Sequence, residues 1–185
     1  MTTKELWKRV QEKVGATPDG IPGRQTATKI LEEFDIAPKT RPNVKGTGKG
    51  IKRIAIHCSA TPEGRDIDAA TIRQWHKNQG WSDIGYHFVI KLDGTIERGR
   101  PESIRGSHVR GFNTGSIGVV YIGGVDSNQK PKDTRTQPQK EAMEQLVRDL
   151  VSAYPGAKVL GHKDHPNVAK ACPSFDAVAW WESVK

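Results

Sequence analysis

The stretch IKRIAIHC, residues 51–58, decides how the rest of the chain is interpreted. It is a run of β-branched and apolar residues, which predicts a buried strand. Before it, hydrophobic residues recur at helical spacing, and after it short apolar strands alternate with helical patterns. Strands interleaved with helices predict an α/β domain with one mixed central β-sheet flanked by helices, preceded by a small all-α helical module.

Further elements of the α/β domain follow from hydrophobic pattern and turn residues. The segment YHFVIKLDGTIERGR predicts a hairpin that turns at Asp93-Gly94. Thr136 and Gln139 match a capping box at the start of the clearest helix. The remaining predicted elements are a helix at residues 69–79, strands at residues 116–124 and 158–162, and a terminal helix at residues 175–184.

Residues 1–37 predict a minimal helical module that is too short for a large core. A first helix is followed by the compact turn TPDGIPG and by a second helix from Arg24. Residues 38–50, PKTRPNVKGTGKG, predict a linker that is semi-stiff at its Pro end and flexible at its Gly end. The alternative for this segment is a long surface loop. The linker interpretation places the second domain at residues 51–185.

Composition restricts the partners and the compartment. The 185 residues carry a net charge of +8. This charge favours binding to a polyanion such as nucleic acid, an acidic membrane or a bacterial wall; the alternative is that it serves only solubility. The basic residues form no single run, so we expect no stable nucleic-acid partner. Only two cysteines occur, and neither a secretory signal nor a membrane-spanning apolar window is visible. We expect a monomer made in a cytoplasm, without membrane insertion.

Two histidines and a cysteine form the candidate metal site. His57 lies near the end of the strand at residues 51–58, His162 ends another strand, and Cys172 follows in the loop of LGHKDHPNVAKACPSFD. Three such ligands are the number that a catalytic zinc uses, with its fourth position open for water. Their spacing is not that of a compact metal motif. From the residues alone, a satisfied core histidine and a buried small cysteine remain the open alternative.

Nucleotide chemistry has little support in the sequence. No Gly-rich phosphate loop follows the strand at residues 51–58, and GTGKG has no strand before it. The zinc-deaminase pattern HxE…PCxxC is also absent.

Five segments, in order, carry a resemblance to a known family: IHCSAT, RQWHKNQGWSDIGYHFVI, DGTIERGR, GSHVRGFNTGSIGVVYIGG, and KACPSFD followed by WW. From residue 51 to its C-terminus, the chain resembles the type-2 zinc N-acetylmuramoyl-L-alanine amidases. It is most similar to the small bacteriophage lysozymes of that family, which are related to peptidoglycan recognition proteins.

The resemblance implies roles for individual residues. His57, His162 and Cys172 correspond to the ligands of one zinc ion per chain, and Tyr86 and Lys170 to residues that assist catalysis. The late loop also offers His165. We choose His162 because it ends a strand, where the backbone is fixed, and expect His165 at the rim.

Other residues near the motifs receive weaker expectations. Three are candidates for substrate contact: His108, Asn113 and Trp81, the last with core packing as its alternative. Phe112 is a further residue that can meet sugar or peptide. We expect His76 and His87 to pack or orient neighbours, Trp180 and Trp181 to pack the terminal helix, and Cys58 to be a free buried thiol pointing away from the metal.

The N-terminal segment LWKRVQEKVGATPDGIPGRQTATKIL resembles the small helical peptidoglycan-binding domain of wall hydrolases, whose signature is a DGxxGxxT turn. The resemblance makes Asp19, Gly20, Gly23 and Thr26 candidate wall-binding residues. A simple helical cap and a DNA-binding helix-turn-helix are the alternatives for this module.

Together the two resemblances imply a phage endolysin that cuts the amide bond between N-acetylmuramic acid and L-alanine in peptidoglycan. We expect it to accumulate in the host cytoplasm and to reach the wall after holin-type release. The alternatives are a non-catalytic peptidoglycan receptor, an additional role as inhibitor of the phage RNA polymerase, and a bacterial wall-remodelling enzyme with the same chemistry.

Overall fold

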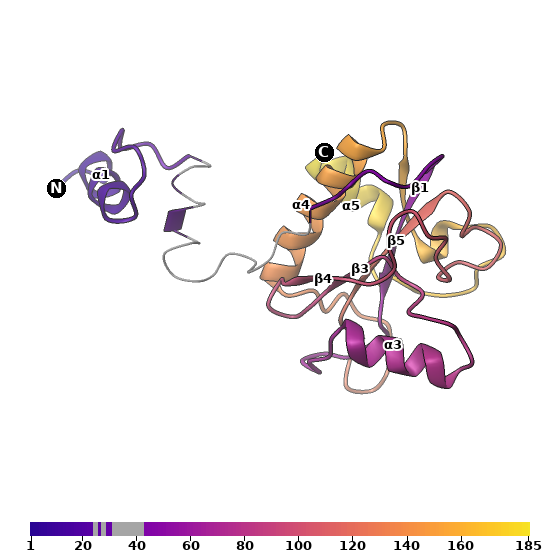
Figure 1. The fold of residues 1–185 in the computed structure, drawn as a ribbon. Helices are drawn as coiled ribbons and strands as arrows, with labels where there is room; N and C mark the ends of the chain where they lie inside the picture. The colour runs from indigo at the N-terminus through magenta and orange to yellow at the C-terminus, as the bar shows by residue number, and fades with distance from the viewer. Residues whose placement is uncertain (24–25, 27–28, 31–42) are drawn as a thin grey trace. The chain divides into compact units, whose positions relative to one another are not determined.

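The computed structural model describes residues 1–23, 26, 29–30 and 43–185 (Figure 1). The chain divides into two compact units, Met1–Lys39 and Thr40–Lys185. Most of the predicted second helix and the first part of the predicted linker lie outside the described residues. Within them, no helix is both long enough and apolar enough to span a bilayer.

The first unit begins with helix α1, Thr3–Lys13, which a capping box between Thr2 and Glu5 starts. The buried Gln11 amide on this helix donates to Asp19 Oδ1 at 2.7 Å and to Thr26 Oγ1 at 2.9 Å, and its oxygen accepts from Gly20 N at 2.8 Å. The DG turn is therefore fastened to α1 through one side chain.

The second unit is built on a five-stranded sheet with the order β4-β3-β5-β1-β7. Its strands are β1 (Arg53–Cys58), β3 (Phe88–Ile90), β4 (Ile96–Arg98), β5 (Ser116–Tyr121) and β7 (Lys158–Gly161). Strand β1 pairs in parallel with β5 and β7, whereas β3 and β4 form the predicted antiparallel hairpin. A separate short parallel pair joins β2 (Thr61–Pro62) to β6 (Gly124–Val125).

Helices cover both faces of this sheet, which confirms the mixed α/β prediction (Figure 1). Helices α4 (Gln137–Ala153) and α5 (Ala177–Val184) pack on one face, and α3 (Ala69–Asn78) packs on the other. The predicted capping box is present at the start of α4. Trp180 and Trp181 of α5 pack against the core, as expected.

Side chains along β1 point alternately to the apolar core and to the face of the sheet that carries the polar site. Ile54 and Ile56 are fully buried in the core that α4 completes. His57 has the opposite orientation because successive side chains of a strand point to opposite faces. This places His57 on the α3 side of the sheet, at the end of its strand.

The described part of the predicted linker, residues 43–50, is attached to the second unit. The buried carboxylate of Glu102 accepts from Lys45 N at 3.1 Å and from Gly46 N at 3.2 Å. Gly48 N donates to Tyr154 Oη at 3.0 Å. The sequence predicted a flexible Gly-rich end, and in the structure side chains distant in sequence accept hydrogen bonds from its backbone amides.

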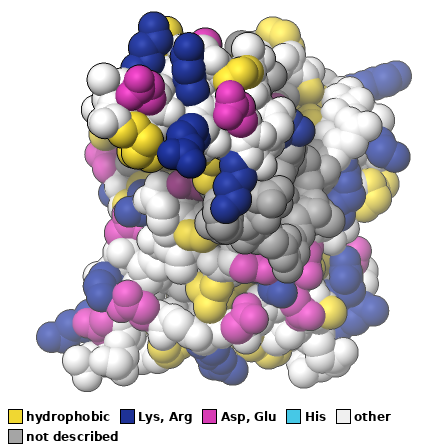
Figure 2. Space-filling view, turned by 90° about the vertical axis from the view of Figure 1, so that its left-hand side faces the viewer, with side chains coloured by type: hydrophobic (Ala, Val, Ile, Leu, Met, Phe, Trp, Pro, Cys, Tyr) yellow, Lys and Arg dark blue, Asp and Glu magenta, His cyan; other side chains and the backbone are white. Residues whose placement is uncertain are grey.

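On the face shown in Figure 2, Lys and Arg side chains are interspersed with Asp and Glu. Mixed signs of charge on one face produce a weaker field than a single basic patch.

Candidate metal centre

Two neighbouring parallel strands bring the two predicted histidine ligands together. Ile56 of β1 is paired with Gly161 of β7, and the next residue on each segment is a histidine. The rings of His57 and His162 consequently lie 4.7 Å apart between centroids. His162 opens a short 3₁₀ helix, η1 (His162–Asp164), directly after its strand.

The loop that carries Cys172 is fastened over the ends of these strands. Lys163 N donates to the Cys172 carbonyl at 2.8 Å. The loop also approaches Gly161 so closely that a Cβ there would lie 2.7 Å from Pro173 Cδ. These contacts bring ligand atoms of His57, His162 and Cys172 within 4.8 Å of one another.

This donor set fits a zinc ion. Cys172 Sγ lies 3.8 Å from His57 Nδ1. Zn–S and Zn–N bonds of ordinary length at a tetrahedral angle would separate the two atoms by about 3.6 Å. Among the described residues, no fourth histidine, cysteine or carboxylate joins the group. Three nitrogen and sulfur donors with an open position are typical of a catalytic zinc.

The electrostatic surroundings keep both imidazoles neutral, which is the form that binds a metal. Burial, together with the other nearby histidines, holds the pKa of His57 well below its usual range. Burial and the Lys170 charge lower the pKa of His162 to about 4. A hydrogen bond with the Cys58 thiol, and then burial, raise the pKa of Cys172. A bound cation would favour the Cys172 thiolate and act against that rise.

Cys58 is the free buried thiol that the sequence predicted. Its side chain belongs to the core beneath α4, and its sulfur lies 3.7 Å from Ser174 Oγ. Its backbone amide donates to Cys172 Sγ at 3.3 Å. Cys58 therefore contacts a proposed ligand although it is outside the donor group, a contact that strand alternation alone does not indicate.

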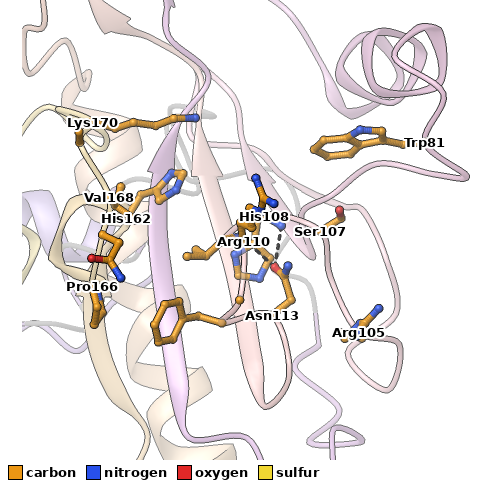
Figure 3. Close-up of a pocket in the computed structure, with 15 residues that line it drawn as sticks. Trp81, Arg105, Ser107, His108, Arg110, Asn113, His162, Pro166, Val168 and Lys170 are labelled. Atoms are coloured by element: carbon orange, nitrogen blue, oxygen red, sulfur yellow. Dashed lines mark hydrogen bonds between the residues drawn. The ribbon is translucent and has the colours of Figure 1, made fainter.

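Tyr86 and Lys170 flank the three donors. The Tyr86 ring lies 5.1 Å from the His57 ring, and burial raises the pKa of its phenol. Tyr86 therefore stays protonated and can donate a hydrogen bond. Lys170 is exposed, and Figure 3 shows its side chain extending from the late loop toward the groove beside His162.

A groove of about 1090 Å³ opens beside the donors. One wall is the loop at residues 105–113, the other is the loop at residues 166–170, and Trp81 adds to the lining (Figure 3). Both His162 and Lys170 line it, so the proposed metal and a proposed catalytic group face the same space.

The three predicted substrate residues have different environments. Trp81 is 37% exposed and stacks on His76 with ring centroids 4.4 Å apart. The Asn113 oxygen accepts from the backbone amides of His108 and Val109, so it braces the loop (Figure 3). His108 also lines the groove but is only 8% exposed, and its Nδ1 lies 3.1 Å from His57 Nε2.

His165 is buried, so its expected position at the rim is wrong. The chain turns after the 3₁₀ helix and tucks the ring inward, where Nδ1 lies 3.1 Å from the Gly161 carbonyl. The ring also packs against Phe112, with centroids 5.3 Å apart. His165 is not part of the donor group.

The predicted supporting histidines are confirmed as such. His76 Nδ1 accepts from Gly85 N at 2.9 Å, next to Tyr86. His87 Nδ1 accepts from Gly118 N at 2.9 Å, and its Nε2 lies 3.0 Å from the Ile104 carbonyl. The sequence prediction omitted the groove cations Arg105 and Arg110. The clustering of these two arginines around the GSH motif in the sequence was the signal that could have predicted their place in the groove.

Comparison with known proteins agrees with this geometry. A family model described as N-acetylmuramoyl-L-alanine amidase matches residues 47–175. The endolysin of Klebsiella phage KP32 is 47% identical over 130 residues, which are 70% of this chain and 85% of that protein. The endolysin of Escherichia phage T7 is 47% identical over 129 residues, 70% of this chain and 84% of that protein.

Solved structures show the same likeness. N-acetylmuramoyl-L-alanine amidase LysC from Clostridium intestinale superposes with a TM-score of 0.61 at 30% identity. The match covers 76% of this chain and 90% of that structure. The family match over residues 47–175 includes the sheet, the groove and the three donors.

Proposed function

The chain belongs to the N-acetylmuramoyl-L-alanine amidase family, and from this premise we propose that it is a zinc-dependent endolysin. The chain hydrolyses the amide bond between N-acetylmuramic acid and L-alanine in peptidoglycan. The zinc proposal rests on one observation. The neutral imidazoles of His57 and His162 and the thiol of Cys172 lie together beside an open groove.

The proposed roles follow from the chemistry of each residue. His57, His162 and Cys172 would hold a zinc ion, which would supply the Lewis acidity needed to activate water and polarise a carbonyl. Tyr86, protonated because burial raises its pKa, donates a hydrogen bond to the oxygen on which negative charge develops. The Lys170 ammonium, on the groove wall that also includes His162, stabilises that same charge.

The groove provides the substrate site. Its two loops leave room for a glycan unit and a peptide at the same time, and typical ligand pockets are no larger than this one. Trp81 offers an exposed aromatic face of the kind that packs on a sugar or a peptide. Asn113 holds the wall in shape, and His108 supports the metal ligand His57.

The biological role that we propose is lysis of the host cell. Synthesis in the host cytoplasm and release by a separate holin-type pore accord with the endolysin relatives. The first unit, with its turn at Asp19, Gly20, Gly23 and Thr26, is proposed to bind the wall. Two linked binding units on one polymer raise the effective concentration of each at its site.

Metal analysis joined to product analysis tests the proposal. The purified protein should contain one zinc per chain, and walls treated with it should release new L-alanine N-termini until a chelator is added. Cys172→Ser should lose zinc and activity together. The appearance of reducing sugars without new N-termini would reject amidase activity, and a zinc-free protein with full activity would reject the metal assignment.

A further inference from the structure

His108 contacts Nε2 of His57, while the other ring nitrogen of His57, Nδ1, faces Cys172. We propose that His108 is a positioning residue: it accepts a hydrogen bond from His57 Nε2 and thereby fixes His57 to bind metal through Nδ1. This inference rests on the proposed zinc site and deepens it, because it assigns a residue outside the three ligands to metal affinity.

The two nitrogens of His57 have different neighbours. Nδ1 lies 3.8 Å from Cys172 Sγ, within the donor group, whereas Nε2 lies 3.1 Å from His108 Nδ1. A neutral imidazole that binds a metal through one nitrogen carries its proton on the other. His57 is then the donor toward His108, and His108 must present an unprotonated Nδ1.

The surroundings of His108 hold its ring in a narrow slot. A Cβ at Gly118 or at Gly106 would lie 2.6 Å from the ring. Asn113 fixes the backbone that carries the ring, through the amides of His108 and Val109. A ring that lies against two glycines, on a backbone that one carboxamide holds, has little freedom to rotate away from His57.

A second histidine makes one wall of the slot rigid. His87 meets His108 edge to face, with ring centroids 5.7 Å apart. Both ring nitrogens of His87 have backbone partners, Gly118 N and the Ile104 carbonyl. The support for His57 is therefore an ordered arrangement of buried rings, which is how outer groups orient metal ligands in proteins.

Two variants of similar size separate the hydrogen bond from the packing. His108→Asn would keep a side-chain oxygen close to the position of Nδ1, whereas His108→Leu would keep a similar shape and remove the acceptor. Competition between the full chain and a chromophoric chelator for Zn²⁺ measures the affinity. We expect His108→Leu to bind zinc about 10- to 100-fold more weakly than wild type, and His108→Asn to retain most of the affinity.

The comparison has outcomes that would overturn the inference. Equal zinc affinity in His108→Leu and wild type, or equal losses in the Leu and Asn variants, would show that the acceptor has no role. Wild-type protein that binds zinc and hydrolyses peptidoglycan in the same assays keeps the proposed function intact in either case. A failure of the proposed function would show itself in wild type.

A measurement on wild type covers the case in which His108→Leu does not fold. In zinc-loaded protein labelled with ¹⁵N at histidine, the His57 proton should reside on Nε2. A through-hydrogen-bond coupling should connect it to an unprotonated His108 Nδ1. A proton on His57 Nδ1, or none on Nε2, would contradict the inference without any substitution.

Discussion

Lys170 illustrates how the site depends on a single side chain. It lies two residues before Cys172, is exposed, and contributes to the lowered pKa of His162 through its charge. Because it is not a donor in the metal group, its removal should leave the metal in place. In the mechanism that we propose, its charge acts on the oxygen that becomes negative during hydrolysis.

We therefore expect Lys170→Ala to retain its zinc and to lose about 10²- to 10³-fold in kcat, the usual cost of removing one group that stabilises an oxyanion. Zinc content and the rate of release of L-alanine N-termini measure the two effects separately. Lys158→Ala, which removes the same charge from an exposed position on β7, is the matched control. Loss of zinc in Lys170→Ala, or a rate equal to the control, would contradict the role.

At the scale of elements, Glu102 attaches residues 43–48, which belong to the predicted linker, to the rest of the second unit. Its carboxylate accepts from Lys45 N, Gly46 N, Tyr154 Oη and Arg98 Nη1. Burial alone would raise its pKa, but these hydrogen bonds and the Arg98 charge outweigh that effect and lower it. The folded state therefore favours the ionised carboxyl group more than the unfolded state does.

From this arrangement we expect the stability of the folded second unit to depend on the Glu102 carboxylate. Glu102→Gln should lower the free energy of unfolding at neutral pH by about 2 kcal/mol. The reason is that a neutral carboxamide replaces a carboxylate that accepts hydrogen bonds from both charged and neutral donors. Trypsin should also cleave after Lys45 faster in this variant. Tyr154→Phe, which removes only one of the donors, should have a smaller effect in both assays.

The pH dependence has a defined sign. A carboxyl group whose pKa is lower in the folded state than in the unfolded state stabilises the protein at pH values above its unfolded-state pKa. This contribution disappears as the pH falls through the folded-state pKa. Wild type should therefore lose more stability than Glu102→Gln when the pH is lowered below the ordinary Glu range. Parallel denaturation curves for the two proteins across that range would show that Glu102 is not the responsible group.

The elements also show which features a sequence pattern can predict. Apolar alternation and capping signals predict the main strands and helices, because each depends on residues close together in the chain. The attachment of residues 43–48 and the burial of His165 depend on distant partners, Glu102 and Phe112. The contact between His57 and His108 likewise depends on how a loop folds back, which periodicity does not report.

At the scale of the whole molecule, Gln11 determines whether the proposed wall-binding turn keeps its shape. Three of the four candidate residues, Asp19, Gly20 and Thr26, bond directly to its amide. Gly20 has a φ of +77°, and a Cβ there would lie 2.8 Å from the Lys4 carbonyl. These motif residues thus shape the turn against α1, so any wall contact uses surfaces that the turn presents.

Gln11→Leu should therefore separate tethering from catalysis in the full chain. The variant keeps the size of the side chain but loses its hydrogen bonds, so co-sedimentation with purified peptidoglycan should weaken by at least about tenfold, since linked binding contributes about 10²- to 10⁴-fold. Hydrolysis of a small soluble muropeptide should stay at the wild-type rate, because the donors and the groove lie entirely in the second unit. Glu12→Ala, at the exposed neighbouring position, serves as the control. Unchanged sedimentation of Gln11→Leu, with the turn shown by NMR to be disordered, would mean that the first unit does not tether the enzyme to the wall.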